Sequence, residues 1–163
     1  MHNMIIEIRP ERPFSDCELQ NGVMNIDEIL ADYGSLYFDY IREHPDERED
    51  CLDRFAQRIG GIFDRNGDCL TFHQAGYERF ILAYIYRIQR LVAEITPWNF
   101  FPEKQWQLHK LARLNEEWCD VFVYTEDNGI QPVDEWLMTS GIFDDKEGEG
   151  REYYIGKVYD YHG

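Results

Sequence analysis

The residues whose spacing comes nearest to a known chemical motif are Asp64, Asn66 and Asp68. They place side-chain oxygens at alternate positions, as the loop of a calcium-binding EF-hand does. That loop also needs a glycine at its sixth position, where the chain turns sharply, and a bidentate glutamate at its twelfth. Counted from Asp64, these positions hold Cys69 and Ala75. Because the turn residue and the last ligand are both missing, we expect no calcium site here.

The same stretch has the sequence pattern of a β-hairpin. Asn66 and Gly67 form a dipeptide favoured in two-residue type I′ turns, because both central positions of that turn need positive φ. The runs on either side, 61–65 and 68–72, are short and rich in residues typical of strands. The sequence therefore predicts a hairpin over Ile62–Phe72 that forms without metal.

Histidine and cysteine suggest two further kinds of chemistry. His73 follows Cys69 by four residues, and a cysteine beside a histidine can act as a nucleophile. Along a strand, however, four residues span about 13 Å, so we expect His73 to be an ordinary surface or loop residue. The other cysteines, Cys17, Cys51 and Cys119, are widely spaced, and no pair has the C-x-x-C spacing of zinc or redox sites. We expect no metal and no other cofactor.

His109 lies on a predicted helical face with Trp106, Lys110 and Arg113. Such a face can stack on a ligand and hold an anion, although a solvated face whose tryptophan covers the edge of the core is the commoner arrangement. The sequence contains no pattern of a phosphate-binding loop, a dinucleotide-binding fold, a zinc protease or a serine hydrolase. A small hydrolase or nucleotide-processing enzyme that uses carboxylates or His109 is kept as the alternative function.

Charge is the most informative feature of the composition. The chain has 32 acidic and 16 basic side chains, which gives a net charge of −16. The acid is concentrated at the ends: residues 1–60 have 14 acidic and 6 basic side chains, residues 61–115 have 5 and 7, and residues 116–163 have 13 and 3. This charge repels nucleic acid and anionic membranes and attracts basic surfaces. We expect neither a signal peptide nor a membrane span, and the scattered cysteines predict a cytoplasmic location.

Two acidic clusters form the predicted surface for a basic partner. One lies near residue 50, and the other is spread between residues 126 and 149. The carboxylates predicted to bind the partner are Asp46, Glu47, Glu49, Asp50, Asp53, Glu126, Asp127, Asp134, Glu135, Asp144, Asp145, Glu147 and Glu149. A net charge of about 2–8 in magnitude already keeps a small domain soluble, and excess like charge destabilises a fold by self-repulsion. The excess therefore favours a binding role, with solubility alone as the competing interpretation.

Apolar periodicity predicts the elements that must position these side chains. The expected elements before the hairpin are a strand at Met4–Ile8, a loop over 9–22, a helix begun by Asn25 and interrupted at Gly34, a second helix over 35–44, and a third over Asp46–Ile59. Those after it are a helix at Tyr77–Ile95, a helix from Pro102 to about Glu117, an interior strand over 119–125, a short helix at Pro132–Met138 and a strand over 151–161. Tyr77–Ile95 is apolar on most of its circumference, so we expect it to be central to the core.

These elements predict an α+β fold over residues 1–163, a single acidic domain with several helices packed on a small, mostly antiparallel sheet. In composition the chain resembles acidic inhibitors such as phage anti-defence proteins and toxin immunity proteins, a resemblance that assigns no residues. With the charge, it predicts a non-enzymatic protein that binds and blocks a basic, nucleic-acid-handling protein such as a nuclease. Acting as a mimic of nucleic acid, it would bind neither nucleic acid nor membrane itself.

Overall fold

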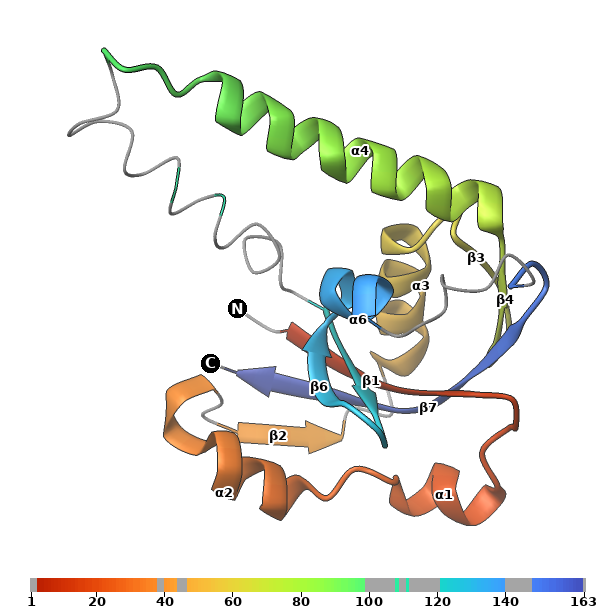
Figure 1. The fold of residues 1–163 in the computed structure, drawn as a ribbon. Coiled ribbons are helices and arrows are strands. Elements are labelled where there is room, and N and C mark those ends of the chain that lie inside the picture. Colours follow the sequence, from red (N-terminus) through yellow and green to blue (C-terminus); the bar gives the residue numbers. More distant parts are fainter. Residues whose placement is uncertain are drawn as a thin grey trace.

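The computed structural model describes residues 3–37, 40–43, 47–98, 108, 111, 121–139 and 148–162. In them a seven-stranded mixed sheet has helices on both faces, which confirms a single-domain α+β fold (Figure 1). The strands are β1 (Asn3–Pro10), β2 (Tyr40–Glu43), β3 (Phe63–Asn66), β4 (Cys69–Phe72), β5 (Val121–Thr125), β6 (Gly129–Pro132) and β7 (Glu152–His162). The helices are α1 (Asp16–Asn21), α2 (Ile26–Tyr37), α3 (Arg48–Arg58), α4 (Gln74–Ala93) and α6 (Val133–Thr139).

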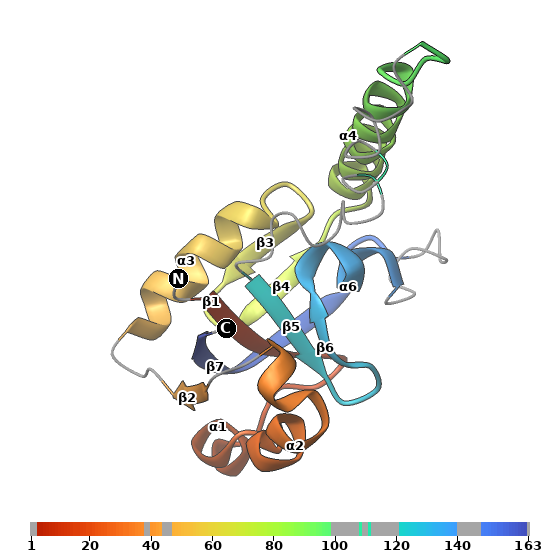
Figure 2. The same cartoon turned by 90° about the vertical axis from the view of Figure 1, so that its left-hand side faces the viewer.

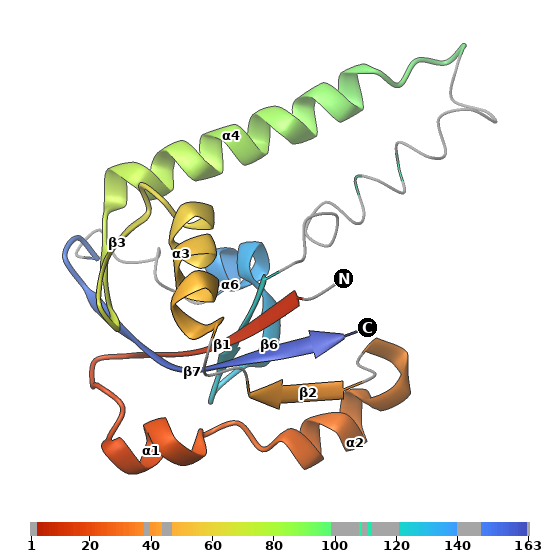
Figure 3. The same cartoon turned by 180° about the vertical axis from the view of Figure 1, so that it is seen from behind.

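The long strand β7 organises the sheet. The strand order of the sheet is β3-β4-β7-β1-β5-β6, and β2 also pairs with β7. Along one side β7 runs antiparallel to β1, and on the other it pairs first with β4 and then, nearer its end, with β2 (Figure 3). Among the strand pairs in the described ranges, only β1 with β5 is parallel. The expectation of a mostly antiparallel sheet is therefore confirmed.

Alternating side chains of β1 divide the core between the two faces of the sheet, as the pleat of a strand requires. Met4, Ile6 and Ile8 are buried with residues of α3 and α6. Ile5 points the other way and is buried with Met24, at the entry to α2. In Figure 1 the two helix layers are accordingly seen on opposite sides of the sheet, α3 and α6 on one and α1 and α2 on the other.

The pairing of β1 with β7 is irregular at Glu7. Ile6 pairs with Val158 but Ile8 pairs with Ile155, so the register shifts between them. β7 therefore contains one extra residue opposite Glu7, which is the arrangement of a β-bulge. The bulge turns the carboxylate of Glu7 toward the backbone of β7 on the face that α1 and α2 cover.

Three predictions for the first half of the chain are wrong. The segment expected to be loop contains α1, whose N-cap is Ser15, with Glu18 completing a capping box. α2 continues past Gly34 to Tyr37, because a glycine inside a helix costs only about 1 kcal/mol relative to alanine. The predicted helix at 35–44 instead includes strand β2, whose backbone hydrogen bonds to β7 outweigh a weak local preference for helix.

The hairpin, α3, β5, α6 and β7 lie where the sequence placed them. The hairpin turn is shifted by one residue, because Asn66 still pairs with Cys69 and the loop is Gly67 and Asp68. Gly67 has a φ of 61°, while Asp68 does not have positive φ, which fits a type II′ pattern rather than type I′. The helix predicted from Pro102 to Glu117 lies almost wholly outside the described residues.

The expectation that α4 is central to the core is wrong. Figure 2 shows the helix projecting away from the sheet, and Gly76, near its start, is its only residue described as buried. The side chains of Leu82 and Tyr86 are 65% and 71% exposed. Tyr77 and Phe80, in the first two turns, pack against the core. At 1.5 Å per residue α4 is about 30 Å long, so its apolar circumference extends beyond the surface that the sheet offers.

Candidate functional site

The predicted partner-binding carboxylates do not form one uniform surface. Asp46, Asp144, Asp145 and Glu147 lie outside the described residues, as does His109 of the alternative enzyme function. The others are distributed over α3, the β5–β6 turn, α6 and the approach to β7. Several of them bind arginines of the same chain, and these internal ion pairs decide which carboxylates are left for a partner.

On α3, Arg65 of β3 neutralises part of the acidic cluster. Its Nη2 lies 2.7 Å from Oε2 of Glu49, and its Nη1 lies 3.0 Å from Oδ1 of Asp53. The hydrogen bond from Arg65 lowers the pKa of Glu49. Asp50, one residue further along the helix, is exposed and has no ion pair within the described part of the chain. Asp50 is therefore the carboxylate of this cluster best placed for an external contact.

Asp134, which the sequence predicts as a partner-binding residue, does not lie on the exposed surface. It is only 3% exposed, and both of its carboxylate oxygens accept hydrogen bonds from Nη2 of Arg58, at 3.1 and 3.0 Å. A charge buried in this way is held by its partner inside the molecule. Glu135, which follows it on α6, is partly exposed.

Glu149 and Asp64 hold His73 from two sides at the start of α4. Nδ1 of His73 lies 2.9 Å from Glu149, and Nε2 lies 2.9 Å from Asp64. Glu149 also accepts the backbone N–H of Gln74, the first residue of the helix, at 2.6 Å. These carboxylates raise the pKa of His73, and the hydrogen bond that His73 makes to Glu149 contributes most. His73 is thus tied to carboxylates, and burial raises the pKa of the Cys69 thiol, so nothing here activates a nucleophile.

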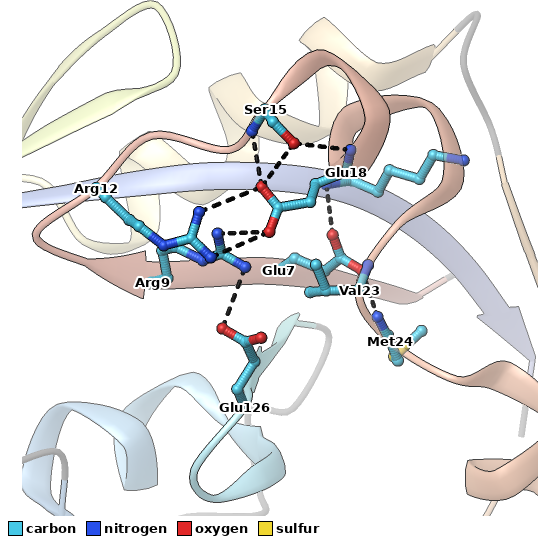
Figure 4. Close-up of polar contacts among 9 residues, drawn as sticks. Glu7, Arg9, Arg12, Ser15, Glu18, Val23, Met24 and Glu126 are labelled. Atoms are coloured by element: carbon cyan, nitrogen blue, oxygen red, sulfur yellow. Dashed lines mark hydrogen bonds and ion pairs between the residues drawn. The ribbon is translucent and has the colours of Figure 1, made fainter.

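Glu126, in the β5–β6 turn, belongs to a cluster that the sequence did not predict. Its Oε2 lies 3.1 Å from Nη2 of Arg9, near the end of β1 (Figure 4). Arg9 is only 4% exposed, and its guanidinium lies 4.2 Å from the centre of the Phe14 ring. Its Nη1 donates a 2.8 Å hydrogen bond to Glu18 of α1. The guanidinium therefore joins β1 to a helix on one side and to the β5–β6 turn on the other.

Glu18 is fixed by the cap of its own helix. It accepts hydrogen bonds from the backbone N–H of Ser15 at 2.8 Å and from its hydroxyl at 2.9 Å (Figure 4). Arg12 adds a further hydrogen bond of 3.2 Å to the same carboxylate. The backbone N–H of Ser15, followed by Arg9, lowers the pKa of Glu18 to about 2. Glu18 is therefore a charged partner for Arg9 throughout the physiological pH range.

A cleft of about 420 Å³ opens beside this cluster. We call it the Arg9 cleft, and its lining residues are Ile8, Arg9, Pro10, Glu11, Arg12, Thr125, Glu126 and Asp127. Although Nη2 of Arg9 is near Glu126, the buried Nε and Nη2 donate no hydrogen bond. Glu11 and Asp127 are exposed and have no ion pair among the described residues. The cleft thus adjoins a buried guanidinium with two donors that make no hydrogen bond, and it has unpaired carboxylates at its edge.

Beneath α1, the carboxylate of Glu7 holds the segment between α1 and α2 against the sheet. Glu7 is fully buried, and its Oε1 accepts the backbone N–H groups of Val23 and Met24, both at 2.8 Å. Its Oε2 accepts the N–H of Lys157 on β7 at 3.0 Å. The tight fit requires glycine at position 22, where φ is 76° and a Cβ would lie 2.1 Å from the Tyr159 hydroxyl. This arrangement fixes the strand that carries Arg9.

Two features of the sequence could have indicated this cluster. Glu7 and Arg9 are polar residues at alternate positions of an otherwise apolar strand, which places both on one face. Ser15 and Glu18 have the spacing of a capping box, which predicts a helix start where a loop was expected. Neither feature shows that the β5–β6 turn approaches the same place, since that depends on the pairing of β1 with β5.

The remaining chemistry considered from the sequence has no site in the described residues. Asp64 binds His73, and Asp68 lies 2.9 Å from Arg48, so the oxygens of the hairpin face different partners. The described ranges contain no group of three or more His, Cys, Asp or Glu side chains placed to hold a metal ion. No helix within those ranges is long and apolar enough to cross a membrane.

No family model, no curated protein and no solved structure matches the chain.

Proposed function

We propose that this is a non-enzymatic acidic protein that binds a basic surface of another protein and blocks it. The observation that carries the proposal is an imbalance in ion pairing. Of the basic residues, those in ion pairs with carboxylates of the chain include Arg9, Arg12, Arg42, Arg48, Arg58, Arg65 and Lys157. Exposed carboxylates outside α4 with no ion pair in the described ranges include Glu11, Asp16, Asp27, Glu28, Asp50, Asp127 and Glu152. Ion pairing within the chain therefore uses basic side chains and leaves unpaired carboxylates at the surface.

Such a surface suits a partner that handles nucleic acid, for example a nuclease. Proteins of that class bind phosphates through clusters of lysine and arginine, and carboxylates on a rigid fold can occupy the same positions. Arginines are also present outside the acidic surface, on the projecting helix α4, where Arg79 and Arg90 are exposed. The acidic surface of the proposal is therefore formed by the sheet and its covering helices, and α4 is not part of it.

The test reverses the charge at one carboxylate at a time and compares the result with that of a matched control variant. The partner is first captured from a lysate of the source organism on the immobilised protein at low salt and eluted at high salt. Association with the captured protein is then measured for wild type, Asp50→Lys and Asp127→Lys. Each reversal should slow association more than it speeds dissociation, because exposed charges act mainly on the encounter. The effect should fade toward 1 M salt, where the Debye length is about 3 Å.

Glu78→Lys on α4 is the control, since it changes the net charge equally at an exposed site outside the acidic surface. Equal slowing by Glu78→Lys would mean that net charge alone matters. If neither Asp50→Lys nor Asp127→Lys alters the association rate at physiological salt, the proposal is wrong and the acid serves solubility. Asp53 is not used, because reversing it would break its ion pair with Arg65.

A further inference from the structure

We propose that the Arg9 cleft receives an extended segment of the basic partner, with a backbone carbonyl of that segment bound by Arg9 and a lysine or arginine side chain bound among Glu11, Glu126 and Asp127. The inference rests on the proposed function and names its binding site. Two independent features support it: the buried guanidinium of Arg9, a residue that lines the cleft, has two donors without a hydrogen bond, and unpaired carboxylates lie at the edge.

The donors belong to Arg9. Buried polar groups in proteins are nearly always hydrogen-bonded, yet Nε and Nη2 of this 96% buried residue donate no hydrogen bond. Nη2 forms an ion pair with Oε2 of Glu126 at 3.1 Å but no hydrogen bond, and both unused donor atoms are buried, so Glu126 must move aside for a ligand oxygen to reach them. The guanidinium itself is held in place by Glu18 and by the Phe14 ring. An acceptor oxygen from a ligand would complete its hydrogen bonding.

The two unpaired carboxylates at the edge, Glu11 and Asp127, lack the helix-end position that accounts for several other unpaired carboxylates. Asp16, Asp27 and Asp50 lie in the first turns of helices, where the helix dipole favours negative charge. Glu11 and Asp127 lie in no helix and have no ion pair in the described part of the chain. Glu11 also has a φ of 71°, which is unfavourable for any residue except glycine and, less so, asparagine or aspartate.

The balance of charge decides what kind of group can enter. Glu11, Glu18, Glu126 and Asp127 outnumber Arg9 and Arg12, so a phosphate or free carboxylate would meet net repulsion. A backbone carbonyl is neutral and can accept from Arg9, while a neighbouring cationic side chain can pair with the carboxylates. A volume of about 420 Å³ accommodates one long side chain and the adjoining backbone. A second copy of this chain is a poor occupant because of its net charge of −16.

The probe is the peptide acetyl-Gly-Arg-Gly-amide, which has one cationic side chain, neutral ends and free carbonyls. It is titrated into the ¹⁵N-labelled full chain while the Nε–Hε resonances of the arginines are followed, with that of Arg9 identified from its loss in Arg9→Lys. We expect a saturable shift at Arg9 and at the amides of Glu126 and Asp127. The peptide acetyl-Gly-Glu-Gly-amide should give no saturable shift. Glu11→Gln with Asp127→Asn should weaken binding at least about threefold, as expected for the loss of two exposed ion pairs, whereas Asp50→Asn should not.

An unshifted Arg9 resonance at the highest peptide concentration would overturn the inference, and so would an equal response to the glutamate peptide. Undiminished binding by the double variant would also overturn it. The proposed function is tested separately by the captured protein. If Asp50→Lys slows its association while Glu11→Gln with Asp127→Asn leaves both rate constants unchanged, the cleft is not the docking site and the proposed function still holds.

Discussion

The hydroxyl of Tyr159 donates a 2.9 Å hydrogen bond to Oε1 of Glu7 in the interior, where both residues are at most 1% exposed. Burying a carboxylate is costly unless donors replace the water it loses. Glu7 has four such donors, the Tyr159 hydroxyl and three backbone N–H groups from Val23, Met24 and Lys157. Burial and the adjacent Glu7 raise the pKa of Tyr159, so its proton is retained.

Replacing Glu7 should therefore destabilise the fold more than replacing Tyr159. Glu7→Ala leaves four donors without an acceptor, two of them buried and two partly buried. A buried donor left unpaired costs about 1–3 kcal/mol before relaxation, so we expect a loss of at least about 3 kcal/mol in the free energy of unfolding. Tyr159→Phe removes one donor and should cost about 1.5–3 kcal/mol, the range for a hydrogen bond to a charged group. Urea denaturation measures both, with exposed Asp127→Ala as the control. A smaller loss for Glu7→Ala than for Tyr159→Phe would contradict this account.

The ion pairs of His73 predict a pH dependence of stability. Hydrogen bonds to Glu149 and Asp64 raise the pKa of His73 above its ordinary 6.5. The contribution of His73 to the free energy of unfolding is therefore full below pH 6.5 and is lost as the pH rises through the raised pKa. Hydrogen bonds from His73 and from the backbone of Gln74 lower the pKa of Glu149 below 4.5. Its contribution is therefore present above pH 4.5 and is lost as the pH falls through the lowered pKa. Both contributions are complete between about pH 4.5 and 6.5.

His73→Gln should thus lower the melting temperature most between pH 4.5 and 6.5, and progressively less toward pH 9. Melting followed by circular dichroism at half-unit steps of pH measures the difference. In a Glu149→Gln background, His73→Gln should have a smaller effect and a flatter pH profile. A difference between wild type and His73→Gln that grows with increasing pH would show that the imidazolium does not stabilise the root of α4.

Comparison of α3 with α4 shows what sequence patterns could and could not predict. Both helices were expected from apolar periodicity, and both are present. Periodicity shows which faces of a helix are apolar. For α3 this was enough to predict which side is buried, because Leu52 and Phe55 pack in the core against the sheet. For α4 it did not show that most of the helix extends beyond the sheet. In the same way, β2 forms because it pairs with β7, a partner more than a hundred residues away.

The candidate site was less predictable than the fold, for a related reason. Counts of charge indicated an acidic protein, but which carboxylates remain unpaired depends on contacts between distant segments. Asp134 is buried in an ion pair with Arg58, and the pairing of β1 with β5 places Glu126 next to Arg9. Local sequence contained the capping box of Ser15 and Glu18, which is a short-range signal. The floor of the Arg9 cleft required the three-dimensional structure.

The exposure of α4 predicts a contrast between two leucines. Leu52 of α3 is 0% exposed, and Leu52→Ala should cost about 2–5 kcal/mol, as is usual for deleting a large buried aliphatic side chain. Leu82 of α4 is 65% exposed, and Leu82→Ala should change stability by no more than about 0.5 kcal/mol. Denaturant midpoints of the two variants provide the measurement. Equal destabilisation would mean that the outer side of α4 is buried in solution.

The backbone at Glu11 predicts that a substitution at the edge of the Arg9 cleft will stabilise the fold. With a φ of 71°, Glu11 is the only residue other than glycine with positive φ in the described ranges. The left-handed conformation costs a residue with a Cβ about 1–2 kcal/mol, while glycine loses more backbone entropy on folding, by about 0.5–1 kcal/mol. Glu11→Gly should therefore unfold at a higher urea concentration than Glu11→Gln, by up to about 1 kcal/mol in stability. Glu11→Gln is the matched control because it removes the same charge and keeps the Cβ, so its difference from wild type measures relief of repulsion. If the two variants have the same urea midpoint, the backbone of Glu11 is not strained. Its position beside Asp127 and Arg12 then has no energetic cost that a role in binding would need to offset.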